Sequence, residues 1–308
     1  MTQARQPVRE ALPVLSFERT VARRYVHRQA IAEVFLTDCA ELGEPNRFAL
    51  AAQWPRLHGF YRAKHGRFDP MLLAETLRQA AIYLAHTRYR VPPSWRFVMQ
   101  EMHVRAHLDA LRVGMSAADV TAETTLSDLV HRGEVVTSFR IELRYWFAGR
   151  EIGSASGVAV ALPPSAYSRA RWGTAGPRTP GPARCSTAIA PAVVGQVDER
   201  DVVLGRPTGR GEWEVRVDVT HPVLFDHPLD HLPGMLLLEV LRQGAFAALQ
   251  VPDAHLASID AVFHRFAELD QHTTVGVRAL DADPLSVRAV IRQAGSEIAT
   301  GHVRLAHR

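Results

Sequence analysis

The chain has little cysteine and lacks any long hydrophobic run. Only two of its 308 residues are cysteines, Cys39 and Cys185, and neither belongs to a Cys-x-x-Cys motif. This spacing argues against a disulfide framework and against a structural zinc site. No apolar span is long enough to cross a bilayer, and the charged N-terminal segment lacks the apolar core of a signal peptide. We therefore expect a cytoplasmic protein with no membrane partner.

The chain also lacks a large excess of positive or negative residues. The net charge is +4, with 22% charged and 47% hydrophobic residues, which is typical of a globular chain with room for two domains. Such a balance would suit nucleic acid, an acidic carrier protein or a phosphorylated substrate. Without an arginine-rich run or a helix-turn-helix pattern, we expect no nucleic-acid partner. The fifteen histidines show no metal-ligand spacing, so we expect neither a metal site nor a cofactor.

An internal repeat is the most informative feature that is present. Residues 70–81 read PMLLAETLRQAA, and residues 234–245 read GMLLLEVLRQGA. Both segments predict a largely apolar helix with Glu, Arg and Gln at positions i, i+3 and i+4, which share one helix face. These residues are Glu75, Arg78 and Gln79 in the first copy and Glu239, Arg242 and Gln243 in the second.

The repeat extends on both sides of the helices. Residues 27–36 align with 195–204, and residues 48–58 lie opposite 213–221. Residues 139–147 and 285–292 alternate between apolar and polar side chains and are each followed by an Ala-Gly turn, a pattern typical of antiparallel hairpins. We expect repeats at residues 17–162 and 189–308. The segment 163–188 is rich in Pro, Gly and Arg and reads as a linker, with Arg169, Arg171, Arg178 and Arg184 in solvent.

The charged stripe on each helix has two interpretations. An ion pair within a buried helix is costly unless it is fully satisfied. It could fix how the two helices pack, or it could belong to a pair of composite active sites. Duplication is compatible with either reading.

The two helices begin differently. Pro233 and Gly234 precede Met235 without a capping side chain, so the backbone N–H groups and the positive end of the helix dipole are free to bind an oxyanion. In the first copy Asp69 and Pro70 occupy this place, and Asp69 would take up the donors itself. The second helix start is therefore the better oxyanion site, although it could also be a simple tight entry to a helix.

A dense cluster of histidines and aspartates precedes the second helix. The loop contains His221, Asp226, His227, Asp230 and His231 within eleven residues. Such a loop could supply a general base, with His227 the strongest candidate. Each histidine alone could equally be structural.

These motifs resemble a known family. A helix with Pro-Gly-x-Leu-x-x-Glu-x-x-x-Gln character after a histidine loop resembles the hotdog fold of acyl-carrier dehydratases and thioesterases. The whole chain looks like the A-factor biosynthesis family of actinobacteria, which makes γ-butyrolactone signals. The matching segments are residues 26–27, 33–38, 52–56, 58–61, 73–79 and 226–239.

The resemblance implies an α+β fold of tandem hotdog repeats, each an antiparallel sheet wrapped around a long central helix, packed as an intrachain pseudo-dimer. It also implies an acyltransferase that moves a β-ketoacyl group from acyl carrier protein to the hydroxyl of dihydroxyacetone phosphate. The dehydratase histidine pattern is altered here, because Pro228 follows His227 and the loop to Pro233 is shorter.

Site residues follow from the helix pattern and the resemblance together. We expect a shared site in which His227 and the Gly234 N–H act with Glu75, and Glu239 is the repeat-related carboxylate. Arg78 or Arg242 would hold the phosphate, because a guanidinium matches its geometry. The further candidates for substrate binding are Gln79, Gln243, His221 and His231. A hotdog thioesterase or dehydratase and a non-catalytic butyrolactone-binding regulator are the alternatives, and a homodimer is left open.

Overall fold

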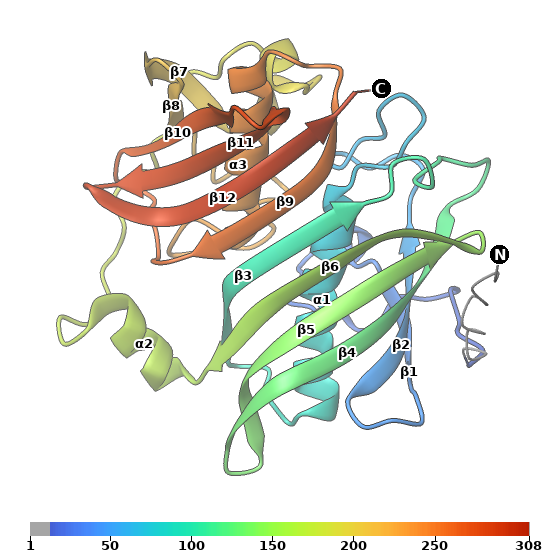
Figure 1. The fold of residues 1–308 in the computed structure, drawn as a ribbon. Coiled ribbons are helices and arrows are strands. Elements are labelled where there is room, and N and C mark those ends of the chain that lie inside the picture. Colours follow the sequence, from blue (N-terminus) through green and yellow to red (C-terminus); the bar gives the residue numbers. More distant parts are fainter. Residues whose placement is uncertain (1–12, 308) are drawn as a thin grey trace.

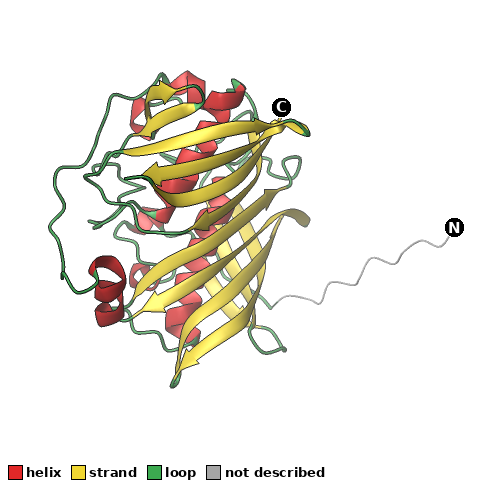
Figure 2. Cartoon of the chain, turned by 60° about the vertical axis from the view of Figure 1, so that its left-hand side comes forward, coloured by secondary structure: helices red, strands yellow, loops and turns green. Residues whose placement is uncertain are grey.

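A computed structural model describes residues 13–307, so the first part of the charged N-terminal segment lies outside the described residues. The fold is one antiparallel sheet of twelve strands in the order β1-β2-β4-β5-β6-β3-β9-β12-β11-β10-β8-β7. Figures 1 and 2 place the two long helices, α1 and α3, on the same face of this sheet. Each half of the sheet curves around its own helix, which confirms the tandem hotdog predicted from the sequence.

The two halves have the same element order. The first contains β1 (Leu36–Glu41), β2 (Arg47–Trp54), α1 (Met71–Arg88), β3 (Arg96–Ala106), β4 (Ala118–Arg132), β5 (Val135–Phe147) and β6 (Arg150–Leu162). The second contains β7 (Leu204–Gly209), β8 (Glu212–Val215), α3 (Gly234–Leu249), β9 (His255–Phe263), β10 (Thr273–Leu280), β11 (Asp283–Gln293) and β12 (Ser296–Ala306). Four short 3-10 turns lie outside these elements, at Arg23–Tyr25, Ile31–Glu33, Pro191–Val194 and Glu199–Asp201.

Strands β3 and β9 join the halves. They pair antiparallel, with Met102 opposite Ala261 and Val104 opposite Ile259. The strand order on one side of this junction mirrors the order on the other, so an approximate two-fold axis relates the repeats. The consequence for the site is that the N-terminal end of β3 lies beside the C-terminal end of β9.

The helices are buried because apolar side chains surround most of their circumference. Trp54 on β2 is fully buried, and its indole N–H donates to Thr76 Oγ1 of α1 at 3.0 Å. The Tyr145 hydroxyl donates to the Leu73 carbonyl at 2.9 Å. These bonds satisfy polar groups that would be costly to bury unpaired. They also fix α1 against the sheet.

Both predicted Ala-Gly turns are present. Ala148 and Gly149 have φ values of 48° and 74°, and Ala294 and Gly295 have 48° and 76°. Two successive residues with positive φ form the tight hairpin connection that matches strand twist. The hairpins β5–β6 and β11–β12 follow the alternation seen in the sequence.

The segment between the repeats is more ordered than a solvated linker. It contains helix α2 (Pro164–Trp172), which projects beside the sheet in Figure 1. The expectation that Arg171 is solvated is wrong: its side chain is 1% exposed and its Nη1 lies 2.7 Å from Glu268 Oε1. Arg178 is also paired, with Asp270 at 2.6 Å. None of the helices within residues 13–307 is long and apolar enough to span a membrane.

Candidate active site between the repeats

A cavity of about 910 Å³ opens between the two repeats. The first repeat contributes residues 27–28 and one face of α1 to the lining. The second repeat contributes the histidine loop and the start of α3. Polar residues in its lining include His27, Arg28, Arg78, Arg96, Tyr167, Arg171, Asp226, His227, Asp230, His231, His264, Arg265 and Glu268. Of the predicted site residues, Arg78, His227, His231 and Gly234 are brought together here.

Glu75 lies behind this cavity rather than in its lining. Its carboxylate is fully buried and accepts from Arg28 Nε at 3.1 Å, Arg78 Nε at 3.0 Å and Gln79 Nε2 at 2.7 Å. Burial alone would raise the pKa of Glu75, but the charges of Arg28 and Arg78 outweigh burial and lower the pKa to about 2. The carboxylate is therefore a permanent anion that orients two arginines at the cavity wall.

The histidine loop of the second repeat is docked on the first repeat. Asp226 accepts from the backbone N–H groups of Gln29 at 2.5 Å and Ala30 at 3.1 Å. Arg28 Nη1 donates to the Val223 carbonyl at 3.0 Å. Charge-assisted bonds of this kind hold the loop in register with Arg28. The cavity is thus lined by residues of both repeats of one chain.

The two helix starts differ as the sequence predicted. Asp69 Oδ1 accepts from the Met71 N–H at 2.9 Å and so takes up a donor at the start of α1. Helix α3 follows Pro233, has no capping side chain, and begins at the cavity with Gly234 and Met235. Its first N–H groups are available to a ligand.

His27 forms an unusual pair of imidazoles at the cavity wall. Its Nε2 lies 2.9 Å from Nε2 of His86, and His86 Nδ1 lies 2.7 Å from the Val91 carbonyl. Burial, reinforced by His86, lowers the pKa of His27 to about 3, so the pair is neutral at physiological pH. His27 has a φ of 49°, at the position where the second repeat has Gly195 with 68°. A non-glycine residue in this region is uncommon and its backbone is strained.

His227 of the second repeat lines the same cavity as His27. Its Nδ1 is 3.7 Å from Asp226 Oδ2. Burial lowers the pKa of His227, and the charge of Asp226 only partly offsets this effect. A neutral imidazole able to accept a proton therefore faces the cavity.

In the repeat-related cluster around Glu239, the arginine is bound by two carboxylates. Arg242 donates to both Glu239 and Asp69, with Nη1 at 2.8 Å from each Asp69 oxygen. Burial raises the pKa of Glu239, and Arg242 offsets the rise only in part because it is shared with Asp69. The adjoining cavity is about 110 Å³. Asp69 therefore accepts a hydrogen bond at the start of α1 and also binds Arg242, the arginine that would otherwise be free to bind a ligand.

The remaining predicted residues hold the loops. Gln79 accepts from the Phe35 N–H at 2.9 Å and donates to the Glu33 carbonyl at 2.8 Å. Gln243 likewise accepts from the Val203 N–H at 2.9 Å and donates to the Asp201 carbonyl at 2.7 Å. Neither glutamine lines the large or the small cavity described above.

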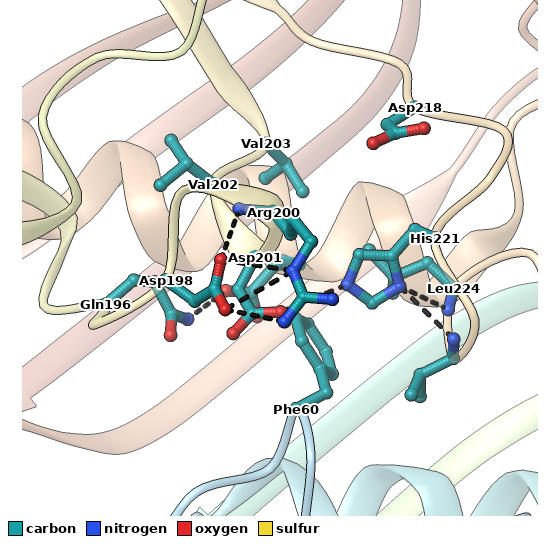
Figure 3. A network of polar contacts seen from close by, with 12 residues as sticks. Phe60, Gln196, Asp198, Arg200, Asp201, Val202, Val203, Asp218, His221 and Leu224 are labelled. Carbon is teal, nitrogen blue, oxygen red and sulfur yellow. Dashed lines mark hydrogen bonds and ion pairs between the residues drawn. The ribbon is translucent and has the colours of Figure 1, made fainter.

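His221 has a comparable internal role. Its Nδ1 accepts from the N–H groups of Val223 and Leu224 at 3.2 and 3.1 Å, and its Nε2 lies 3.3 Å from Asp201 (Figure 3). His58 repeats this arrangement with Phe60, Tyr61 and Glu33. The structure places His221 outside the large cavity, where it shapes the loop before α3.

Several residues of the cavity wall were missed from the sequence. Arg28 and His27 lie in an irregular segment with no helical or strand periodicity, and Tyr167 lies in the segment read as a linker. The signal that could have found the first two is the repeat itself. Arg28 aligns with Gln196, and each donates to the helix glutamate of its own repeat, Gln196 at 3.1 Å from Glu239.

No group of three or more His, Cys, Asp or Glu side chains within residues 13–307 is arranged to hold a metal ion. The polar components of the cavity include arginines, imidazoles, carboxylates, a tyrosine and the backbone N–H groups at the start of α3. This set can bind an anionic ligand, stabilise an oxyanion and accept a proton.

Comparison with known proteins places this architecture in a family. The model of the A-factor biosynthesis hotdog domain matches residues 11–163 and 178–306. The chain belongs to this family. Relatives of this chain carry the name 2-oxo-3-(phosphooxy)propyl 3-oxoalkanoate synthase, and two of them are described here. The protein from Streptomyces virginiae is 37% identical over 263 residues, covering 85% of this chain and 88% of the relative. The protein from Streptomyces coelicolor is 35% identical over 276 residues, covering 88% and 86%.

A solved structure shows the same fold. An acyl-ACP thioesterase from Bacteroides thetaiotaomicron superimposes with a TM-score of 0.51 at 9% identity, covering 84% of this chain and 98% of the thioesterase. At this identity the likeness concerns the tandem hotdog fold. The A-factor family chain described here thus has the family's two hotdog units in one polypeptide.

Proposed function

We propose that this protein is an acyltransferase that moves a β-ketoacyl group from acyl carrier protein to the hydroxyl of dihydroxyacetone phosphate, in the biosynthesis of a γ-butyrolactone or related signal. The product is the 2-oxo-3-(phosphooxy)propyl 3-oxoalkanoate after which its relatives are named. The observation that carries the proposal is the open composite cavity, which joins an uncapped helix start to an arginine wall.

The start of α3 supplies the oxyanion site in this proposal. Attack on a thioester carbonyl places negative charge on its oxygen, and the N–H groups of Gly234 and Met235 can accept that charge. One such donor contributes about 3 kcal/mol to transition-state stabilisation. Leu237 and Phe263 line the same cavity and give an acyl chain apolar contacts.

Arg78 is the proposed ligand of the acceptor phosphate. Its Nε and Nη2 are bound to Glu75, while Nη1 has no hydrogen-bond partner in the described chain. Its side chain is 17% exposed and lines the cavity. Arg242, the repeat-related alternative, is held by Asp69 and Glu239 and is therefore not proposed for this role.

The carrier protein would approach the cavity rim where β3 begins and β9 ends. Arg96 and Arg265 line this rim from different repeats, are exposed, and form no ion pair with another described residue. Acyl carrier proteins are acidic and their prosthetic arm contains a phosphate, so two free cations would steer and hold them. A cytoplasmic location fits this donor, and a homodimer stays a prediction.

The test is product analysis by mass spectrometry. Purified protein is incubated with a 3-oxoacyl-acyl carrier protein, with and without dihydroxyacetone phosphate. The proposal predicts a phosphorylated ester that appears only with the acceptor. Free 3-oxo acid at the same rate in both incubations would instead indicate a thioesterase, and an unchanged thioester would refute catalysis with this donor.

A further inference from the structure

His231 and Asp230 form a hydrogen-bonded pair in the cavity wall, three residues before Gly234. The Nδ1 of His231 lies 2.6 Å from Asp230 Oδ1. Because an aspartate can only accept, the Nδ1 of a neutral His231 carries the proton and its Nε2 carries the lone pair. No described residue is hydrogen-bonded to Nε2, and the ring lines the cavity. This arrangement matches an imidazole base oriented by a carboxylate.

The carboxylate is itself held by the connecting helix α2. The Tyr167 hydroxyl donates to Asp230 Oδ1 at 2.7 Å, and Arg171 Nη2 donates to the Asp230 carbonyl at 2.7 Å. Arg171 also forms two bonds with Glu268, at 2.7 and 3.1 Å, which fasten α2 to the second repeat. Asp230 belongs to the loop before α3, but helix α2 holds it in place.

The ring of His231 is fixed from its sides as well. Phe266 meets it edge to face, with ring centroids 4.9 Å apart and an interplanar angle of 84°. Tyr167 packs against the same phenylalanine at 5.8 Å. Aromatic contacts of this geometry restrict the rotation of the imidazole. A base needs such a defined orientation if it is to meet one particular hydroxyl.

The first repeat has no counterpart of this pair. Leu232 donates to the Ala267 carbonyl and Phe68 donates to the Leu111 carbonyl, which identifies these two residues as equivalent positions. The residues before Phe68 are Gly66 and Arg67, where the second repeat has Asp230 and His231. Arg67 Nε is bound to the Leu108 carbonyl at 3.1 Å. The hotdog repeat therefore folds without the pair, so the fold alone does not require it.

We propose that His231 is the general base of the acyl transfer, that Asp230 orients it, and that Tyr167 of α2 is a positioning residue. This assignment rests on the function proposed above. His231 Nε2 removes the proton from the acceptor hydroxyl as its oxygen attacks the thioester carbonyl. When the tetrahedral intermediate collapses, the C–S bond breaks and the imidazolium returns the proton to the leaving thiolate. The products are the ester and the carrier thiol.

The inference is tested by steady-state kinetics with 3-oxoacyl-acyl carrier protein and dihydroxyacetone phosphate. His231→Gln should lower kcat by about 10²–10⁴-fold. Asp230→Asn should lower kcat by at least about tenfold, because the amide allows the wrong imidazole tautomer. For Tyr167→Phe we expect a smaller loss in kcat with KM for the acceptor unchanged. Unfolding curves verify that each variant is folded.

His103→Gln is the matched control. His103 forms a second histidine–aspartate pair, with Asp260 at 2.8 Å across the β3–β9 junction, but it does not line the large cavity. This variant should keep the wild-type kcat. Added imidazole should restore part of the turnover of His231→Ala, as it would for a missing base and not for a packing defect.

Two outcomes would overturn the assignment. A folded His231→Gln with wild-type kcat refutes it while leaving the proposed function intact. Loss of kcat in His227→Gln with none in His231→Gln would transfer the role of base to the other imidazole of the loop. If the wild-type protein forms no ester, the proposed function fails first, and the two failures are therefore distinguishable.

Discussion

Replacing the two helix glutamates separately with glutamine should have unequal effects on stability. Glu75 is the counter-ion of both Arg28 and Arg78, whose side chains are 6% and 17% exposed. In Glu75→Gln these cations lose their shared carboxylate and keep neutral acceptors, among them the carbonyls of Val223 and Val26. Leaving a buried charge uncompensated costs about 3–5 kcal/mol. We expect a loss of that size in the free energy of unfolding.

Glu239→Gln should be milder because Arg242 retains another counter-ion. Both oxygens of Asp69 stay at 2.8 Å from Arg242 Nη1. The expected loss is about 1–2 kcal/mol, the range for a hydrogen bond removed while the charge remains paired. Turnover should fall strongly in Glu75→Gln, since Arg28 and Arg78 lose their orientation, and stay near wild type in Glu239→Gln.

Urea unfolding followed by circular dichroism gives both free energies, and the ester assay gives both turnovers. Equal losses of stability and turnover in the two variants would refute the reasoning. That result would mean that the two clusters are equivalent despite the Asp69–Arg242 ion pair.

Three further predictions follow from the same contacts. Gly234→Pro introduces the residue that the first repeat has at this position, Pro70, and removes one backbone N–H where proline is favoured. Turnover should fall by about 10²–10³-fold with an unchanged melting temperature. Wild-type turnover would exclude that N–H as an oxyanion donor. Acid should destabilise the fold. His27 has a pKa of about 3 in the folded protein against 6.5 for the free side chain, so unfolding takes up a proton and the free energy of unfolding falls as the pH drops below about 6.5. Glu75, whose pKa is lowered from 4.5 to about 2, adds to this loss below about pH 4.5. Urea midpoints between pH 7 and 4 check this, and a flat profile would contradict it. Replacing Arg96 and Arg265 with glutamine should raise KM for the acyl carrier protein and weaken its salt dependence; an unchanged salt profile would remove the rim from carrier recognition.

The repeated architecture was readable from the sequence because duplication, alternation and helix periodicity are local signals. The hairpins at Ala148–Gly149 and Ala294–Gly295 and the cap at Asp69 were predicted from such signals and are present. The difference between the two helix starts was also visible. These features depend on residues that are neighbours in the chain or equivalent in the repeats.

The parts that sequence reasoning missed depend on contacts between distant segments. Arg28 meets Glu75 across 47 positions and Val223 across 195, and Arg171 meets Glu268 across 97. Such pairs leave no periodic trace. The proline- and glycine-rich composition of residues 163–188 also concealed helix α2, which is held by tertiary ion pairs rather than by helix propensity. The contacts of α2 with the second repeat are therefore visible only in the three-dimensional structure.

The most direct test of the account blocks each cavity in turn. Ala170 and Ala63 are exposed alanines that line the large cavity and the small one, respectively. Acceptor-dependent ester formation is measured for Ala170→Trp and Ala63→Trp after both are shown to be folded. We expect Ala170→Trp to lose most of its turnover and Ala63→Trp to keep it. The reverse result, or equal turnover in both variants, would contradict catalysis at the large cavity between the repeats.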